Sequence, residues 1–188
     1  MRLFLAVNLN ENLKNTINKK IKDLNNNSKT SMKLVKKDNF HITLKFLGNV
    51  DEDKINLIKE KMDFLSKYHN SFILTIDKIN AFPEIDYPKV IYLAIKDQQN
   101  SLIKLHRDLD YKLNEIGFKR NERVYLPHVT LARTSKDTDI KRLSIIIKKY
   151  KDRISINNKI QVKKIYLMKS ILKEDGPIYK EIYSANMS

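Results

Sequence analysis

Apolar and polar residues alternate in several short stretches of this chain. Alternation is typical of β-strands, because successive side chains of a strand point to opposite faces of the sheet. The last stretch follows Gly176 and Pro177 and is expected to add a strand at the edge of a sheet. The predicted strands cover residues 2–7, 32–35, 40–47, 72–79, 90–95, 128–132, 160–168 and 178–183.

Longer stretches place their apolar residues three or four positions apart, which is the spacing of one face of an α-helix. In the first of them this stripe runs from Leu13 to Leu24, and the polar residues 25–30 are expected to end the helix. Asp51 is expected to cap the second helix, and Gly117 is expected to close the third. The predicted helices cover residues 11–24, 55–65, 101–116 and 139–150.

The predicted elements follow the same order twice, as a strand-helix-strand-helix-strand unit in each half of the chain. The first strands of the two units begin 88 residues apart, at Arg2 and Val90, and two histidines, His41 and His128, lie 87 residues apart. We interpret this pattern as an internal duplication, in which both histidine-bearing strands lie beside one pseudo-twofold axis and face one cleft. The repeated units would cover about residues 2–79 and 90–168.

Composition bounds the size and charge of the fold. The 188 residues are 41% hydrophobic, which fits a single folded domain over residues 1–188, made of two intertwined lobes, rather than a disordered chain. Thirty-seven Lys and Arg residues against 22 Asp and Glu residues give a net charge of +15. This charge favours a polyanionic partner such as RNA, DNA or an anionic membrane surface.

Two absences narrow the expected location and chemistry. No stretch approaches the roughly 18 apolar residues of a membrane span, and the apolar opening at residues 2–7 is too short for a signal peptide. A soluble, cytoplasmic protein is therefore expected. The chain contains no cysteine, which excludes disulfides, thiolate nucleophiles and cysteine-ligated zinc.

One five-residue pattern occurs on two of the predicted strands, as HITLK at 41–45 and HVTLA at 128–132. On a strand, His41, Thr43 and Lys45 would share one face, and His128 and Thr130 would likewise align on one face. The residues between them would point into the core. Each strand would then have one apolar side and one side suited to chemistry.

Paired imidazoles are suited to acid and base catalysis. A histidine can act as a base when it is neutral and as an acid when it is protonated, so a pair in opposite states can cleave a phosphodiester with a bell-shaped pH profile around neutrality. Threonine hydroxyls can donate hydrogen bonds to the phosphoryl oxygens. A single histidine in a strand is usually structural, but the same pattern at matching repeat positions favours catalysis. His69 and His106 lack this setting and are interpreted as structural or solvent-exposed.

The chain resembles the 2H phosphoesterase superfamily, named for paired His-x-Thr/Ser-x motifs, and within it the RNA 2′,3′-cyclic phosphodiesterases, also known as 2′-5′ RNA ligases. The resemblance extends over essentially the whole chain, and the two histidine motifs are its most specific part. The matching segments are RLFLAV at 2–7, HITLKFLG at 41–48, FP at 82–83, PKVIYL at 88–93, PHVTLAR at 127–133, SIL at 170–172 and GPIY at 176–179.

The resemblance implies a bilobal α+β fold in which mainly antiparallel sheets line a central cleft, with the helices outside. It also implies that His41 is the general acid that protonates the departing 3′-oxygen, and that His128 is the general base that activates water. Thr43 and Thr130 would hold the phosphate. Arg133 would grip phosphate or the flanking nucleotide, although strand parity points it away from His128 unless a bulge re-aims it.

Other assignments are secondary. Lys45 would add positive potential to the cleft, and Phe4, Phe46 and Tyr125 are candidates to stack on a base. The basic runs at residues 33–37 and 148–153 are candidate contacts to an RNA backbone. A metal site is disfavoured because neither motif carries an Asp or Glu on its strand, and threonine is a poor ligand for zinc.

The resulting hypothesis is an enzyme that needs no metal or other cofactor and hydrolyses RNA 2′,3′-cyclic phosphate ends to 2′-phosphate ends, with reversible 2′-5′ ligation by the same site. Its expected partners are RNA ends of this kind, including tRNA fragments, and no membrane; the protein is expected to be a monomer. Two alternatives stay open. One is a noncatalytic RNA-binding module, and the other is a phosphodiesterase for 2′,5′-linked oligonucleotides or small cyclic nucleotide phosphates.

Overall fold

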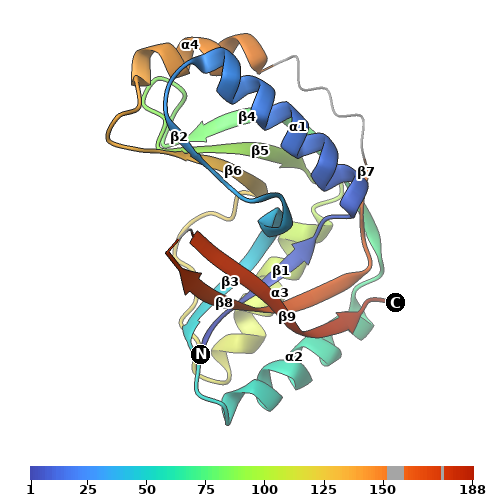
Figure 1. Cartoon of the computed structure of the whole chain (residues 1–188). Coiled ribbons are helices and arrows are strands. Elements are labelled where there is room, and N and C mark those ends of the chain that lie inside the picture. The colour runs from blue at the N-terminus through green and yellow to red at the C-terminus, as the bar shows by residue number, and fades with distance from the viewer. Residues whose placement is uncertain (152–158, 175) are drawn as a thin grey trace.

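A computed structural model describes residues 1–151, 159–174 and 176–188 of the chain. These residues form one curved nine-stranded sheet with α-helices packed on its outer side (Figure 1). The second basic run, at residues 148–153, lies partly outside the described residues. The elements in chain order are β1 (Arg2–Asn8), α1 (Glu11–Ser28), β2 (Met32–Leu34), the 3-10 helix η1 (Lys37–Asn39), β3 (His41–Asn49), α2 (Lys54–Tyr68), β4 (Phe72–Phe82), β5 (Val90–Lys96), α3 (Ser101–Asn114), β6 (His128–Thr134), α4 (Ile140–Tyr150), β7 (Lys159–Val162), β8 (Lys164–Lys173) and β9 (Gly176–Asn186).

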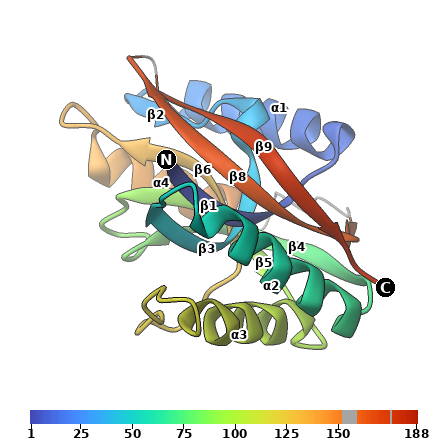
Figure 2. The same cartoon turned by 90° about the horizontal axis from the view of Figure 1, so that it is seen from below.

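The sheet is antiparallel throughout, with the strand order β7-β4-β5-β6-β3-β1-β8-β9, and β2 pairs with β6. Its middle is narrow, because β3 and β6 are joined only through the pair Ile42 and Val129. Helix α1 packs on α4 and helix α2 on α3. The two pairs lie at opposite ends of the molecule (Figures 1 and 2). The expected α+β class, with antiparallel strands lining a cleft and helices outside, is confirmed; the two lobes share one continuous sheet.

The order of elements along the sheet bears on the proposed duplication. From the narrow middle outward, the strand order is β3-β1-β8-β9 on one side and β6-β5-β4-β7 on the other. The chain crosses between these halves repeatedly, because α1 follows β1 in sequence but packs against α4 of the other half. The boundaries of the repeated units and the single-domain organisation stay an interpretation of this pattern.

Helix α1 extends further than its sequence pattern predicts. Asn10 caps its start, since the Asn10 side chain accepts a hydrogen bond from the backbone N–H of Leu13 at 2.8 Å. The polar residues 25–30 do not end it after Leu24. The helix runs to Ser28, whose buried hydroxyl donates to the carbonyl of Asn25, and ends where Lys29 adopts a left-handed backbone with φ +47°. Asparagine is a weak helix former rather than a helix breaker, so packing decides the boundary.

Of three other predicted boundaries, one agrees with the structure and two do not. Asp139 caps α4 as expected, through a hydrogen bond from the N–H of Arg142 at 3.0 Å. Asp51 does not cap α2 with its side chain; Asp53 occupies the position before this helix, and Asp51 offers only its backbone carbonyl to Lys54. The single strand predicted over residues 160–168 is two strands, β7 and β8, because β7 pairs with β4 and β8 pairs with β1 on the other side of the cleft. Strand β9 lies at the sheet edge, as expected.

The core lies between the sheet and the helices, and it extends to the inner face at one place. Alternate side chains of β1, such as Leu3 and Leu5, join the main core under the helices. The intervening Phe4 and Ala6 form a smaller buried cluster with Met168 on the opposite face, beneath the cleft. Within the described residues, no helix is both long and apolar enough to span a bilayer.

Candidate active site

The two histidine motifs lie on β3 and β6, the strands that meet at the middle of the sheet. They open into one cavity of about 590 Å³. All five predicted site residues line this cavity. They are His41, Thr43, His128, Thr130 and Arg133, and they share its walls with Lys33, Lys36, Lys173 and Tyr179, among others.

Both histidines are oriented by the same backbone device. The Nδ1 atom of His41 lies 2.7 Å from the carbonyl oxygen of Asn39, and Nδ1 of His128 lies 2.7 Å from the carbonyl oxygen of Leu126. A carbonyl can only accept, so each Nδ1 carries the hydrogen and donates it. In the neutral ring Nε2 is therefore unprotonated and available as a base. Nε2 of His41 lies 3.0 Å from the hydroxyl of Thr43.

Aromatic rings surround both imidazoles. Their ring centroids lie 5.0 Å (Phe4) and 5.2 Å (Tyr179) from that of His41, and 5.2 Å (Phe82) and 5.3 Å (Tyr92) from that of His128. The pKa of His41 is lowered to about 4, mainly by burial; the Asn39 carbonyl opposes this shift, and the charges of His128 and Lys14 add to it. Burial also lowers the pKa of His128, and Arg133 acts in the same direction. Both histidines are thus neutral at pH 7 in the free protein.

A β-bulge in β3 changes the faces on which the first motif places its side chains. Ala6 of β1 faces Thr43, but the next residue back, Leu5, faces Lys45, so Leu44 is the extra residue. After the bulge Lys45 points into the core, where it is 2% exposed. Lys45 therefore leaves the face that carries His41, and its ammonium is paired with Asp110 instead of adding free positive charge beside the histidines. Phe46, 69% exposed, lines the cavity instead.

An equivalent bulge in β6 brings Arg133 into the cavity. Ile91 of β5 faces Ala132 and Tyr92 faces Thr130, so Leu131 is the extra residue, 87 positions after Leu44. Strand parity alone would point Arg133 away from His128, as the sequence suggested. The bulge reverses that parity, and Arg133 lies on the cavity wall, exposed and on the same face as His128 and Thr130.

Two side chains from the 101–127 segment hold the bulge of β3. The Tyr125 hydroxyl donates to the carbonyl of Thr43 at 3.0 Å, and Nδ1 of His106 donates to the carbonyl of Leu44 at 2.8 Å. The two rings stack with centroids 3.9 Å apart. His106 is therefore structural, as expected. Tyr125 likewise has a structural role, because its hydroxyl holds the bulge and one face of its ring is covered by His106.

The other two aromatic candidates differ in exposure. Phe4 is buried beneath His41 and Tyr179, so its assignment as a base-stacking residue is wrong. Phe46 remains the exposed candidate. His69 lies at the end of α2 and bonds to Asp108 at 3.1 Å, which is a structural role.

The sequence analysis did not predict that aromatic rings pack on the histidines, and it gave Phe4 a different role. Tyr92 packs on His128, and Phe4, 88 residues earlier, packs on His41. An aromatic residue at the same position of both repeats was the available signal. The signal for Tyr179 was weaker, because Tyr179 lies on β9 and comes close to His41 only through the pairing of β9 with β8. Among the described residues, no three side chains of the His, Cys, Asp and Glu types gather as metal ligands would.

Comparison with known proteins gives consistent results. The family model described as LigT like Phosphoesterase matches the chain twice, over residues 7–92 and 93–179. The chain is 38% identical over 182 residues to an RNA 2′,3′-cyclic phosphodiesterase of Methanocaldococcus jannaschii, covering 97% of this chain and 98% of that protein. It is 30% identical over 182 residues to a protein of the same name from Archaeoglobus fulgidus, with the same coverage.

Two solved structures share the fold. The crystal structure of TT0787 of Thermus thermophilus superposes with a TM-score of 0.78 at 20% identity, covering 100% of this chain and 98% of that one. Escherichia coli LigT complexed with 3′-AMP superposes with a TM-score of 0.72 at 20% identity, covering 100% and 98%.

Proposed function

Because the chain belongs to the LigT-like phosphoesterase family, we propose that it hydrolyses RNA 2′,3′-cyclic phosphate ends to 2′-phosphate ends by acid and base catalysis through His41 and His128. The observation that carries this proposal is the convergence of both imidazoles, both threonine hydroxyls and one guanidinium on a single cavity. These groups match the needs of the reaction, which are a base, an acid and donors to the charged phosphoryl oxygens.

In the proposed reaction Nε2 of His128 takes a proton from a water molecule as the water oxygen attacks phosphorus. The bond between phosphorus and the 3′-oxygen breaks, and Nε2 of His41 gives its proton to that oxygen. The 2′-phosphate remains as the product. Thr43, Thr130 and Arg133 donate hydrogen bonds to the nonbridging oxygens, where charge accumulates in the transition state. The cyclic phosphate carries its own strained ring, so no metal is needed to activate it.

The acid needs a proton that the free protein does not hold near neutral pH, because the pKa of His41 is about 4. A bound phosphodiester places a negative charge beside the ring, and an opposite charge raises the pKa of an imidazole. Substrate binding thus favours protonation of His41, which can then act as the acid. The neutral state of His128 in the free protein already suits a base.

We expect this arrangement to shift the pH profile toward acid. For kcat/KM, which reports the free enzyme, the acid limb should lie near pH 4 and the alkaline limb below 6.5, since the pKa values of both histidines are lowered. For kcat, the alkaline limb should lie at higher pH, because the bound phosphate raises the pKa of His41. Steady-state kinetics from pH 3.5 to about 9 measures both limbs. If the alkaline limbs of kcat and kcat/KM coincided, bound substrate would not raise the pKa of His41, and this part of the proposal would be wrong.

Arg133 is expected to act mainly on substrate binding. Arg133→Ala removes a charge-assisted bond to phosphate, which contributes about 1.5–3 kcal/mol, so we expect KM to rise about tenfold to a hundredfold with a smaller loss of kcat. Arg133→Lys should recover only part of the affinity, because lysine lacks the planar fork. The matched control is Arg142→Ala, an exposed arginine of α4 outside the cavity. An unchanged KM in Arg133→Ala would show that the bulge does not serve substrate binding.

The direct test is incubation of the purified protein, in EDTA, with a short RNA that ends in a 2′,3′-cyclic phosphate. Separation of 2′-phosphate from 3′-phosphate products identifies the bond that breaks. Exclusive 2′-phosphate formation would support the proposal. RNA bound without turnover would favour the noncatalytic binding module, and a panel with 2′,5′-linked oligonucleotides and small cyclic nucleotide phosphates would identify the other alternative.

The finer assignments belong to the same proposal. By microscopic reversibility, the site can join a 2′,3′-cyclic end to a 5′-hydroxyl and form a 2′,5′ linkage. RNA fragments such as those of tRNA are proposed as substrates, and the protein is proposed to act as a monomer. Incubation with both kinds of end, and sedimentation of the purified protein, test these two points.

A further inference from the structure

A second cavity opens on the other side of the histidine pair. It has a volume of about 940 Å³ and shares Thr43, Phe46 and His128 with the cavity already described. The two cavities are therefore branches of one cleft, and they meet where the phosphate would react. We call the cavity that contains His41 and Tyr179 the first branch, and the cavity that contains Phe82 and Arg123 the second branch.

The two histidines are distributed unequally between these branches. His128 lines both of them, whereas His41 lines only the first. In a displacement at phosphorus, the attacking and leaving oxygens lie roughly in line on opposite sides of the phosphorus atom. With His128 as base and His41 as acid, which rests on the proposed function, the nucleophile approaches from the second branch. The nucleoside that carries the leaving 3′-oxygen lies in the first.

The second branch is larger than a water nucleophile requires. Hydrolysis needs one water molecule beside His128, and a narrow recess would hold it. A volume of about 940 Å³ is instead at the upper end of the 300–1,000 Å³ that is typical of pockets for organic ligands. The exposed apolar side chains of Val124 and Leu126 form part of its wall and offer contact area to a base or sugar.

The charges of the second branch match a phosphate backbone. Its exposed cations outnumber its single carboxylate, Glu122, which is paired with Lys119 at 2.7 Å. Arg120 has a long contact of 3.4 Å to Asp110. Within the described residues, no ion pair involves Lys89 or Arg123, so both remain available to a ligand. The exposed cations are Lys89, Lys119, Arg120 and Arg123.

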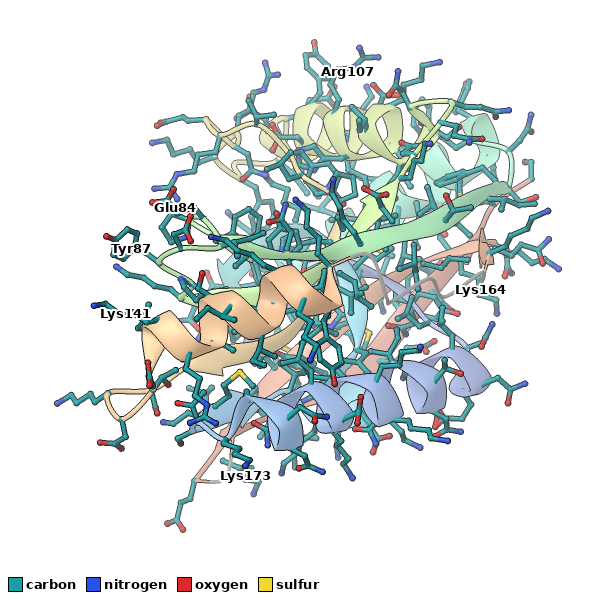
Figure 3. All side chains as sticks on the ribbon, turned by 90° about the horizontal axis from the view of Figure 1, so that it is seen from above. Glu84, Tyr87, Arg107, Lys141, Lys164 and Lys173 are labelled. Carbon is teal, nitrogen blue, oxygen red and sulfur yellow. The ribbon has the colours of Figure 1, made fainter. Side chains whose placement is uncertain are left out.

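The first branch has its own set of exposed cations, away from the second. These residues come from the segment before β3, from β6 and from the end of β8, where Figure 3 shows Lys173 extending from the hairpin tip. One polyanionic strand in the first branch therefore does not need the cations of the second. The exposed cations of the first branch are Lys33, Lys36, Arg133 and Lys173.

We propose that the second branch binds a second RNA strand and presents its 5′-hydroxyl to the phosphorus atom held between the histidines. His128 takes the proton of this hydroxyl as the 5′-oxygen bonds to phosphorus. The bond from phosphorus to the 3′-oxygen breaks, and His41 protonates that oxygen. The product is a 2′,5′-phosphodiester, and no further reagent is needed. The second branch thus selects between ligation and hydrolysis by holding a strand or leaving room for water.

The test is a binding measurement with the first branch filled. A 3′-labelled oligoribonucleotide with a free 5′-hydroxyl is titrated by fluorescence anisotropy in saturating nucleoside 2′-monophosphate. The wild type should bind the oligonucleotide, and Arg123→Ala should weaken binding about tenfold and reduce the salt slope by about 1, as expected for one lost phosphate contact. Lys89→Ala is a second variant with the same expected direction. Ligated product, relative to hydrolysed product, should fall by a similar factor.

The matched control is Arg107→Ala. Figure 3 shows Arg107 pointing outward from α3, and it lines neither branch. Its guanidinium lies 3.4 Å from Asp108. The substitution removes the same charge without touching the cleft, so oligonucleotide affinity should stay within about twofold. Equal losses in Arg107→Ala and Arg123→Ala would overturn the proposal, because they would indicate attraction by net charge alone.

Further outcomes would also overturn it. Displacement of the oligonucleotide by the nucleoside 2′-monophosphate would mean that both occupy the first branch. Binding without any 2′,5′-joined product would show that the bound strand is not the nucleophile. Hydrolysis of a mononucleoside 2′,3′-cyclic phosphate on the same preparations separates the two ideas: if hydrolysis proceeds and the second branch binds no strand, only this inference is wrong, and if hydrolysis itself fails, the proposed function is wrong.

Discussion

His128→Ala is expected to lower kcat on a 2′,3′-cyclic phosphate about 10²- to 10⁴-fold, which is the usual contribution of one positioned acid or base. His41→Ala should cost a similar factor, because without it the 3′-oxygen departs unprotonated. The double variant should lose little more than the single variants, since the two groups act in one proton-transfer cycle. Single-turnover assays on a short RNA with a cyclic phosphate end measure these losses.

Affinity and a control make this result specific. Both histidines are neutral in the free protein, so their removal should change the dissociation constant of RNA by a small factor compared with the loss of turnover. His69→Ala is the matched control, because His69 lies at the end of α2, outside the cavity. If His128→Ala kept kcat within tenfold of the wild type, about 1.4 kcal/mol in the barrier, the proposed base would be wrong.

The reacting groups could be predicted because they depend on local sequence. Each His-x-Thr pair shares a strand face over two residues, and neither pair is interrupted by a bulge. The orientation of each ring also comes from a nearby residue, since the carbonyls of Asn39 and Leu126 lie two positions before their histidines. Such short-range geometry follows from the period of a strand.

The faces of the next residues could not be predicted, because they depend on contacts distant in sequence. The bulge at Leu44 is held by Tyr125, 82 residues from Thr43, and by His106, 62 residues from Leu44. One extra residue reverses the faces beyond it, which moves Lys45 into the core and Phe46 into the cleft. The same effect explains why Arg133 reaches the cavity although its parity predicts otherwise.

The break between β7 and β8 has a similar origin. The alternation within residues 160–168 changes phase at Lys163 and Lys164, because the buried positions Ile160 and Val162 are followed by Ile165 and Leu167, but this local signal does not identify the partners of the two strands. The partners decide it, because β7 pairs with β4 and β8 with β1, on opposite sides of the narrow middle. The sequence thus predicts which residues are strands more readily than which strands meet.

Lys45→Met is expected to destabilise the fold by about 3–5 kcal/mol, which is the usual cost of removing one partner of a buried ion pair. The Lys45 ammonium lies 2.5 Å from the carboxylate of Asp110, and the two side chains are 1% and 6% exposed. The same ammonium donates to the carbonyl of Lys119 at 2.8 Å, and Asp110 accepts from the N–H of Asn121. A methionine side chain in place of Lys45 would remove the buried counter-charge of Asp110 and leave only the long 3.4 Å contact to the more exposed Arg120. Urea unfolding followed by circular dichroism measures the change.

The pH dependence of this loss has a definite sign. Burial raises the pKa of Asp110, but hydrogen bonds from Lys45, the Asn121 N–H and Arg120 outweigh it and hold the pKa below its ordinary value of 3.8. A carboxyl with a lowered pKa stabilises the fold above its unfolded pKa, and this stabilisation is lost as the pH falls through the lower folded pKa. Loss of Lys45 raises the pKa of Asp110 relative to the wild type, so the difference between wild type and Lys45→Met should be constant above the raised pKa of the variant and should narrow as the pH falls from there toward the lowered pKa of the wild type.

Two further variants separate the buried charge from general effects of substitution. Lys45→Met combined with Asp110→Leu should lose less stability than Lys45→Met alone, because an apolar pair leaves no buried charge, although the Asn121 N–H and the Lys119 carbonyl lose their partners. Lys112→Met removes a lysine from the exposed pair with Glu115 at 2.8 Å and should stay within about 0.5 kcal/mol of the wild type. A double variant as unstable as Lys45→Met would show that packing, and not the unpaired carboxylate, dominates the loss. In that case the Lys45 and Asp110 side chains would stabilise the bulged strand and the 119–125 loop by their packing and not by their charges.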